Sequence, residues 1–163
     1  MNQINRIKIR DLRLSFKKIG ITTLVAGTAD ITAAMFNFLA QGGEHVSRIF
    51  RFIASGVFGQ AAFERGSFMI YMGGLFHYLI AFLWTTLFFY FYPKLELRLH
   101  KANIYFIGIV YGLVIWCVMN LIVLPLSNTA DLNNTHVQDI IGMVILILCM
   151  GLPISLIYNK NVR

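Results

Sequence analysis

The sequence predicts an all-α integral membrane protein: a four-transmembrane-helix bundle with an extra short amphipathic or re-entrant helix between helices 1 and 2. Of its 163 residues, 58% are hydrophobic and only 13% are charged. A soluble domain of this size carries about 25% charge. Four long apolar stretches run through the chain, and about 20 apolar residues in a helix are enough to cross a bilayer. The length leaves room for one such membrane domain.

The basic residues are distributed unequally between the two sides of the expected membrane. Eleven of the 14 lie in the N-terminal segment, in the connection after the second stretch or in the C-terminal tail. The other three, Arg48, Arg51 and Arg65, lie in the connection after the first stretch. Cytoplasmic connections carry the excess of Lys and Arg, so both termini are expected in the cytoplasm. The net charge of +7 therefore reports orientation in the membrane and does not indicate a nucleic-acid partner.

A basic segment, residues 1–18, precedes the first apolar stretch, and a short tail, residues 159–163, follows the last. Apolar residues interleave with the basic ones in the first segment. Two interpretations have about equal weight. The segment either lies on the anionic cytoplasmic leaflet or is a solvated tail that only sets orientation.

The single membrane domain of residues 19–158 contains the four expected spans. They cover residues 19–40, 67–92, 103–126 and 137–158. Proline removes a helix hydrogen bond, so the second span is expected to end at Pro93. The third should be broken by Pro125, and Pro153 should kink the end of the fourth. Short connections at 93–102 and 127–136 predict that consecutive spans pack as antiparallel neighbours.

The connection between the first two spans is long enough to contain structure of its own. Apolar residues recur at helical spacing in its segment 45–63, and Gly56 and Gly59 then permit a tight turn. The segment is expected to be a short amphipathic helix plus turn on the outer side of the bundle. A helix at the membrane interface is favoured over a re-entrant hairpin, because re-entrant backbone must be covered by protein.

Two ionisable residues, Asp30 and His77, lie deep inside the first and second spans. At about 1.5 Å per residue, Asp30 is ~16 Å from Ile19 and His77 is ~15 Å from Ser67, so both fall near the midplane of a core ~30 Å thick. We expect them to face each other in the bundle interior. A structural polar pair and a proton-titratable or cargo-binding site have about equal weight, since intramembrane ionisable residues lean functional.

Asn120 completes the expected polar centre, nearer the outer rim. It follows Gly108, Gly112 and Trp116 at four-residue spacing, and small residues at that spacing permit close helix packing. Six further polar residues are secondary candidates. They are Thr28, Asn37, Ser55, Ser127, His136 and Asp139. For those around the start of the fourth span, helix capping and ordinary interface polarity are the favoured explanation.

Catalytic, metal and cofactor motifs are not evident in the sequence. Cys117 and Cys149 lie in apolar stretches without metal-ligand spacing, so they are expected to be packing residues. Ser55 is the most attractive serine nucleophile, but it lacks the G-x-S-x-G elbow. An enzyme is therefore not favoured, and no cofactor is expected.

Several short motifs together suggest a family. They are Gly27-Thr28-x-Asp30, the segment 53–59, the segment 74–81 around His77, and the segment 119–127 around Asn120. Over residues 20–157 the chain resembles the YagU-like family of small, uncharacterised four-helix bacterial inner-membrane proteins. The resemblance implies a bacterial inner-membrane location and, beyond an association with acid resistance, no established activity.

Three functions remain open from the sequence. The first is small-solute or proton-linked transport or binding through the polar centre at Asp30 and His77. The second is a non-catalytic structural or partner-binding membrane protein, in which the same residues join helices. A lipid-active membrane enzyme comes third. The lipid bilayer is the expected surrounding, and a pore would need a homo-oligomer because four helices enclose little space.

Overall fold

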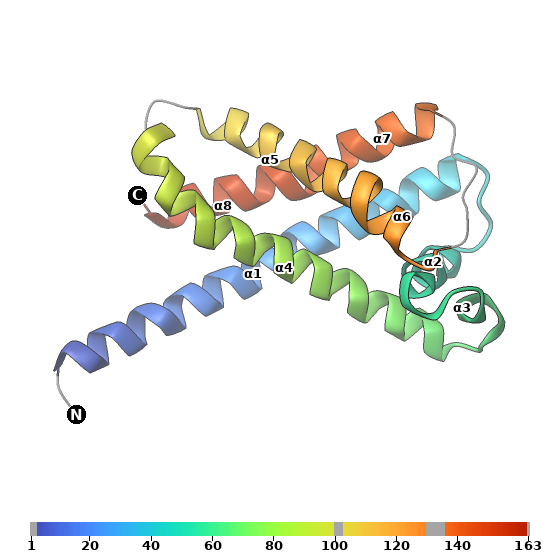
Figure 1. The fold of residues 1–163 in the computed structure, drawn as a ribbon, viewed down its shortest axis with the longest axis horizontal. Coiled ribbons are helices and arrows are strands. Elements are labelled where there is room, and N and C mark those ends of the chain that lie inside the picture. The colour runs from blue at the N-terminus through green and yellow to red at the C-terminus, as the bar shows by residue number, and fades with distance from the viewer. Residues whose placement is uncertain (1–2, 100–102, 130–135, 163) are drawn as a thin grey trace.

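Four long helical runs make up the computed structural model, which describes residues 3–99, 103–129 and 136–162 (Figure 1). Each run is long and apolar enough to cross a membrane, and no strand occurs in these ranges. The apolar parts are Phe16–Ala40, Phe68–Leu95, Ile104–Leu126 and Val137–Lys160. The predicted all-α, four-helix fold class is therefore confirmed.

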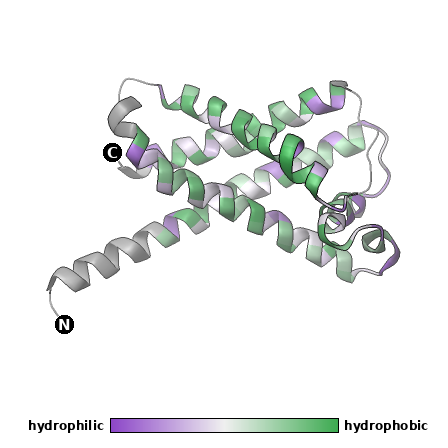
Figure 2. Cartoon of the chain, in the orientation of Figure 1, coloured by the Kyte–Doolittle hydropathy of each residue, from purple (hydrophilic) through white to green (hydrophobic). Residues whose placement is uncertain are grey.

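The outer surface of the bundle is apolar. Large hydrophobic side chains such as Leu24, Leu83, Leu113 and Leu148 are exposed, one or more on each run. Figure 2 shows hydrophobic residues along all four runs and not only on their inner faces. Soluble monomers rarely expose so much contiguous apolar surface. These faces are suited to lipid tails, as expected for an integral membrane protein.

The first helix, α1 (Gln3–Ala40), shows no break between the basic segment and the first span. The basic segment is thus helical from Gln3 onward and continues directly into the membrane-crossing part. Both termini lie at the same end of the bundle, and α1 enters from that end (Figure 1). We call this the termini end and the opposite one the α2 end, after the helix described below.

The second span does not end at Pro93 as the sequence predicted. Helix α4 (Phe68–Leu99) contains Pro93 and continues past it. A proline removes one amide donor and crowds one carbonyl, and that local loss does not terminate a helix whose other turns remain intact. In Figure 1 the yellow-green end of α4 bends away from the rest of the helix.

The third and fourth runs each contain one π-helical turn instead of a break. The third consists of α5 (Ile104–Val118), η1 (Met119–Val123) and α6 (Leu124–Leu126). The fourth consists of α7 (His136–Leu146), η2 (Ile147–Gly151) and α8 (Leu152–Val162). In both, the residue after the π turn donates its N–H to the carbonyl five positions earlier.

Proline explains the position of both π turns. Pro125 and Pro153 each lie two residues beyond the end of a π turn. The proline ring clashes with the carbonyl four residues earlier, which here belongs to Leu121 or Cys149, inside the π turn. The wider π turn moves this carbonyl away from the proline ring and so relieves the clash. The helix therefore passes through Pro125 without a break and ends one residue later, at Leu126.

The third and fourth runs pack together through glycine. Gly108 and Gly112 are buried on α5, and Gly151 of η2 lies against their backbone. A Cβ on Gly112 would come 2.5 Å from the Cα of Ile147. Such an approach is possible only without side chains. The predicted antiparallel contact between spans three and four is confirmed.

Spans two and three meet in a different way, through aromatic rings at the termini end. Phe88 of α4 lies 4.8 Å from Tyr111 of α5 and 4.9 Å from Tyr92, between ring centroids. Tyr158 of α8 joins the same group at 5.1 Å from Tyr92. The Tyr111 hydroxyl also donates to the carbonyl of Trp84. The bulk of these rings separates the two helix backbones.

The segment between the first two spans forms α2 (Ser47–Phe58) and the short α3 (Ala61–Glu64). Gly59 makes the turn between them with a positive φ of 58°, which glycine adopts without strain. Arg51 donates from Nη1 to the Phe63 carbonyl at 2.8 Å and so satisfies the end of α3. The predicted helix plus turn is confirmed.

Helices α2 and α3 lie at the end of the bundle opposite the termini (Figure 1). A Cβ on Gly73 of α4 would collide with the backbone of Phe50, so α2 packs directly on α4. The choice between an interfacial helix and a re-entrant hairpin stays a prediction. One face of α2 also reaches the interior, where it forms part of the site described next.

Candidate functional site

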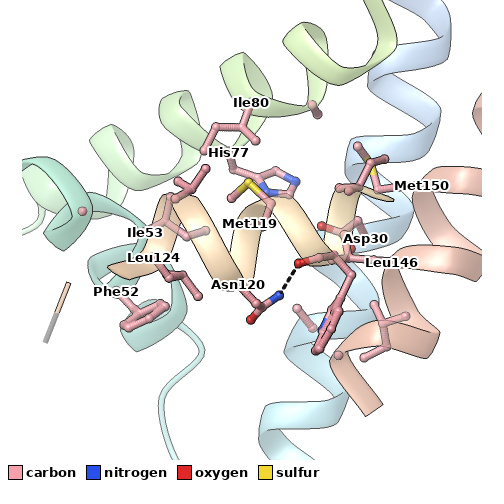
Figure 3. Close-up of a pocket in the computed structure, with 18 of the residues that line it drawn as sticks. Asp30, Phe52, Ile53, His77, Ile80, Met119, Asn120, Leu124, Leu146 and Met150 are labelled. Carbon is pink, nitrogen blue, oxygen red and sulfur yellow. Dashed lines mark hydrogen bonds between the residues drawn. The ribbon is translucent and has the colours of Figure 1, made fainter. Parts of the chain in front are cut away.

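A half-open cavity of about 560 Å³ lies between the helices of the bundle, and its lining includes exposed side chains such as Val57 and Leu79. All four runs and α2 contribute to its lining (Figure 3). Ligand pockets for drug-sized molecules have about 300–1,000 Å³. Most of the wall is apolar, with side chains such as Ile53, Ile80, Leu146 and Met150 facing the space. The cavity therefore has the size and character of a small-molecule site.

The cavity extends from the α2 end to about the middle of the bundle. Asp139 lies two residues after the start of the fourth apolar part, and Asn37 lies three residues before the end of the first. At 1.5 Å per residue, Asp30 lies about 15 Å from Ala40 at the end of the first apolar part. His77 lies about 14 Å from Phe68 at the start of the second apolar part. Between these two residues and the termini end, the bundle is filled by the aromatic group of Phe88, Tyr92, Tyr111 and Tyr158.

Asp30 is a partly buried carboxylate that lines the inner part of the cavity. It interacts electrostatically with His77 of α4. No other described residue donates a hydrogen bond to its carboxylate. The carboxylate is therefore free to accept a hydrogen bond from a molecule in the cavity.

His77 is buried, with 8% of its surface exposed, and it connects two helices. Its Nε2 lies 2.8 Å from the carbonyl oxygen of Gly27 on α1. A carbonyl only accepts, so Nε2 carries the hydrogen and donates it. Gly27 permits the approach, because a Cβ there would already lie 3.2 Å from Ala81. His77 thus ties α4 to α1 while its ring lines the cavity (Figure 3).

Asn120 lines the cavity from η1, the π turn caused by Pro125. Its Nδ2 donates to the Trp116 carbonyl at 3.0 Å, as the dashed line in Figure 3 shows. The side-chain carbonyl oxygen receives no hydrogen bond from the described part of the chain. π turns often occur at functional sites because they reorient side chains. Asp30, His77 and Asn120 therefore share one cavity.

Three of the secondary candidates line the same cavity closer to the α2 end: Asn37, Ser127 and Asp139. Ser127 donates to the Leu124 carbonyl at 2.8 Å and ends the third run. The Asn128 amide then donates to the Gly56 carbonyl at 3.1 Å, which attaches this segment to α2. Ser127 thus caps the end of the third run in addition to its position in the wall.

The other secondary candidates do not line the cavity. Thr28 is exposed on the outside of α1 and shares a hydrogen bond of 2.9 Å with the Tyr78 hydroxyl. Ser55 is fully buried and donates to the Phe52 carbonyl within its own helix at 2.7 Å. A serine held in this way is not an accessible nucleophile. His136 begins α7, and its side chain lies outside the described residues.

Sequence reasoning missed one face of the fourth run. Gln138, Gly142, Leu146 and Met150 all line the cavity. They follow each other at four-residue spacing, which places them on one side of a helix, so the signal was present. It also missed the side chains of α2, because nothing in the sequence shows what α2 covers.

No group of three His, Cys, Asp or Glu suited to a metal ion occurs among the described residues. Comparison with protein-family models, with curated proteins and with solved structures gave no match. The resemblance to the YagU-like family therefore stays a prediction. The cavity itself is the main guide to function.

Proposed function

We propose that this protein binds a small solute inside the membrane, in the cavity that contains Asp30, His77 and Asn120, as the binding step of solute transport. One observation carries the proposal: a cavity of about 560 Å³ between the helices brings together Asp30, His77 and Asn120 from three different spans. A merely structural polar cluster would be expected to satisfy its own groups. Asp30 is not satisfied in that way by the described residues.

The distribution of polar and aromatic side chains along the bundle supports binding in its half nearer α2. Polar side chains occur from the α2 end inward to Asp30, and apolar walls surround them. Beyond Asp30, the packed aromatic rings of Phe88, Tyr92, Tyr111 and Tyr158 occupy the bundle. Passage of a solute to the other side would require these rings to move, as alternating access in transporters does.

We also propose a bacterial inner-membrane location with the termini end in the cytoplasm, because the basic residues concentrate there. In a chain without Cys117 and Cys149, Gln60→Cys should react with a membrane-impermeant maleimide added outside intact cells. Gln60 is exposed in the turn between α2 and α3. Lys160→Cys, exposed near the other end of the bundle, should react only after permeabilisation. The reverse pattern would contradict this orientation.

A non-catalytic structural or partner-binding role is the second candidate. The hydrogen bond from His77 to the Gly27 carbonyl favours it, because this bond joins two spans. That role explains His77 alone. It does not require an internal cavity or an Asp30 without a hydrogen-bond donor among the described residues.

Tryptophan fluorescence can separate these candidates. The chain has 2 tryptophans, Trp84 and Trp116, and both line the cavity. In lipid nanodiscs, water-soluble acrylamide should quench both, because a cavity that binds solutes must admit a small neutral molecule. Trp84→Phe and Trp116→Phe assign the signals to each ring.

Brominated lipid provides the control for this measurement, because it quenches rings that face the bilayer. If brominated lipid quenches both tryptophans and acrylamide quenches neither, the interior is closed to solutes. The binding proposal then fails, and the structural role becomes the better one.

A further inference from the structure

We infer that the solute is an organic cation with an aromatic or other apolar group. This inference rests on the proposed function, since it names the class of molecule that the same cavity would take. Three properties of the cavity carry it: the sign of its charge, the unsatisfied carboxylate at its inner part, and the rings in its wall.

The ionisable groups in the wall favour positive charge. Asp30, Asp139 and His77 are the ionisable lining residues, and no lysine or arginine is among the lining residues that the structure describes. Arg51 of α2 is close in sequence to the lining residues Phe52 and Ile53, but its guanidinium donates to carbonyls at the end of α3. An anionic solute would therefore meet two carboxylates and a single basic side chain, His77, whose Nε2–H is already donated to the Gly27 carbonyl.

The negative charge of the Asp30 carboxylate in particular requires a nearby positive charge. A carboxylate near the middle of a membrane is costly unless it is paired. His77 uses its Nε2–H on the Gly27 carbonyl, so that hydrogen is not available to Asp30. A bound cation would supply the missing opposite charge, and charge-assisted hydrogen bonds are the strong ones.

The rest of the wall indicates an organic cation and not a metal ion. Trp84, Trp116, Phe52 and Phe76 all line the cavity. Aromatic faces attract organic cations, most strongly where water is excluded. Hard metal cations instead need about six or more oxygen ligands, and no metal-binding group of His, Cys, Asp or Glu occurs in the described ranges. The cavity of about 560 Å³ also exceeds what a single ion fills.

Three pyridine compounds of nearly the same shape test the sign of the charge: 1-methylnicotinamide is a cation, nicotinamide is neutral and nicotinate is an anion. Each is titrated into the protein in nanodiscs while tryptophan fluorescence is recorded. The intrinsic quenching of each compound is corrected with free N-acetyltryptophanamide. We expect saturable quenching by the cation, with a Kd about tenfold or more lower than that of the neutral compound, and no saturable quenching by the anion.

Asp30→Asn tests the residue and keeps its size. It should raise the Kd of 1-methylnicotinamide about tenfold or more and leave that of nicotinamide nearly unchanged. Glu64→Gln is the matched control, since Glu64 is an exposed carboxylate of α3 outside the cavity lining. It should change neither value. The thermal unfolding of Asp30→Asn, followed in parallel, shows whether the variant is folded.

The outcomes distinguish this inference from the proposed function. If nicotinamide or nicotinate binds as tightly as the cation, or if folded Asp30→Asn keeps the full cation preference, the inference is overturned while solute binding stands. If Asp30→Asn does not fold, Asp139→Asn takes its place and should also weaken cation binding. If none of the three compounds gives saturable quenching and acrylamide also fails to reach the tryptophans, the proposed function itself fails.

Discussion

Gly151→Ala is expected to disrupt the contact between the third and fourth spans. Its new Cβ would collide with the carbonyl oxygen of Gly108 and would come 2.7 Å from the amide nitrogen of Gly112. Both neighbours are backbone atoms, so no side chain can rotate away. The helices would have to separate along a face of α5 that is buried from Gly108 to Ile115. We expect a loss of about 3 kcal/mol or more in the free energy of unfolding.

The measurement is unfolding of the purified protein in mixed micelles, followed by helical circular dichroism. Gly142→Ala is the matched control in the same helical run, because a Cβ there meets no atom within 4 Å. It should leave stability unchanged or raise it slightly, since alanine is the better helix former. Equal stability of the two variants would show that the glycine contact does not hold these spans together.

Gly142→Phe is expected to abolish solute binding without unfolding the protein. Gly142 lines the cavity, and a side chain built there starts in open space. A phenyl ring would occupy part of the volume of about 560 Å³. We expect the Kd of 1-methylnicotinamide to rise about 100-fold or more, because a filled site loses both the contact area and access to Asp30.

The control for this variant is Gly20→Phe. A Cβ at Gly20 also meets no atom within 4 Å, and Gly20 does not line the cavity. It should bind the cation as the unmodified protein does, and both variants should show cooperative unfolding. Undiminished binding by a folded Gly142→Phe variant would place the solute outside this cavity.

Local spacing was enough to predict much of the site. Asp30, Ala34 and Asn37 recur at helical intervals on α1, and all three line the cavity. The same geometry excludes Thr28, because two residues correspond to about 200° around a helix. Thr28 accordingly lies on the exposed side of α1.

Other features depend on contacts between distant segments. His77 interacts electrostatically with Asp30, and its Nε2 donates to the carbonyl of Gly27, one turn away on the same helix as Asp30. Every residue has a backbone carbonyl, so the sequence carries no mark of this acceptor. Whether α2 covered lipid, solvent or an internal space was equally open, since its apolar face would suit each of them.

The sequence by itself determined the class of this protein, the number of spans, and the depth of Asp30 and His77. These follow from chain length, hydropathy and helical rise, which are local properties. Only the tertiary structure decided that a cavity exists and which residues line it. Glycine brings the third and fourth spans into backbone contact, whereas aromatic rings keep the second and third apart. That unequal spacing depends on which side chains are in contact between helices, and local properties of the sequence do not specify those contacts.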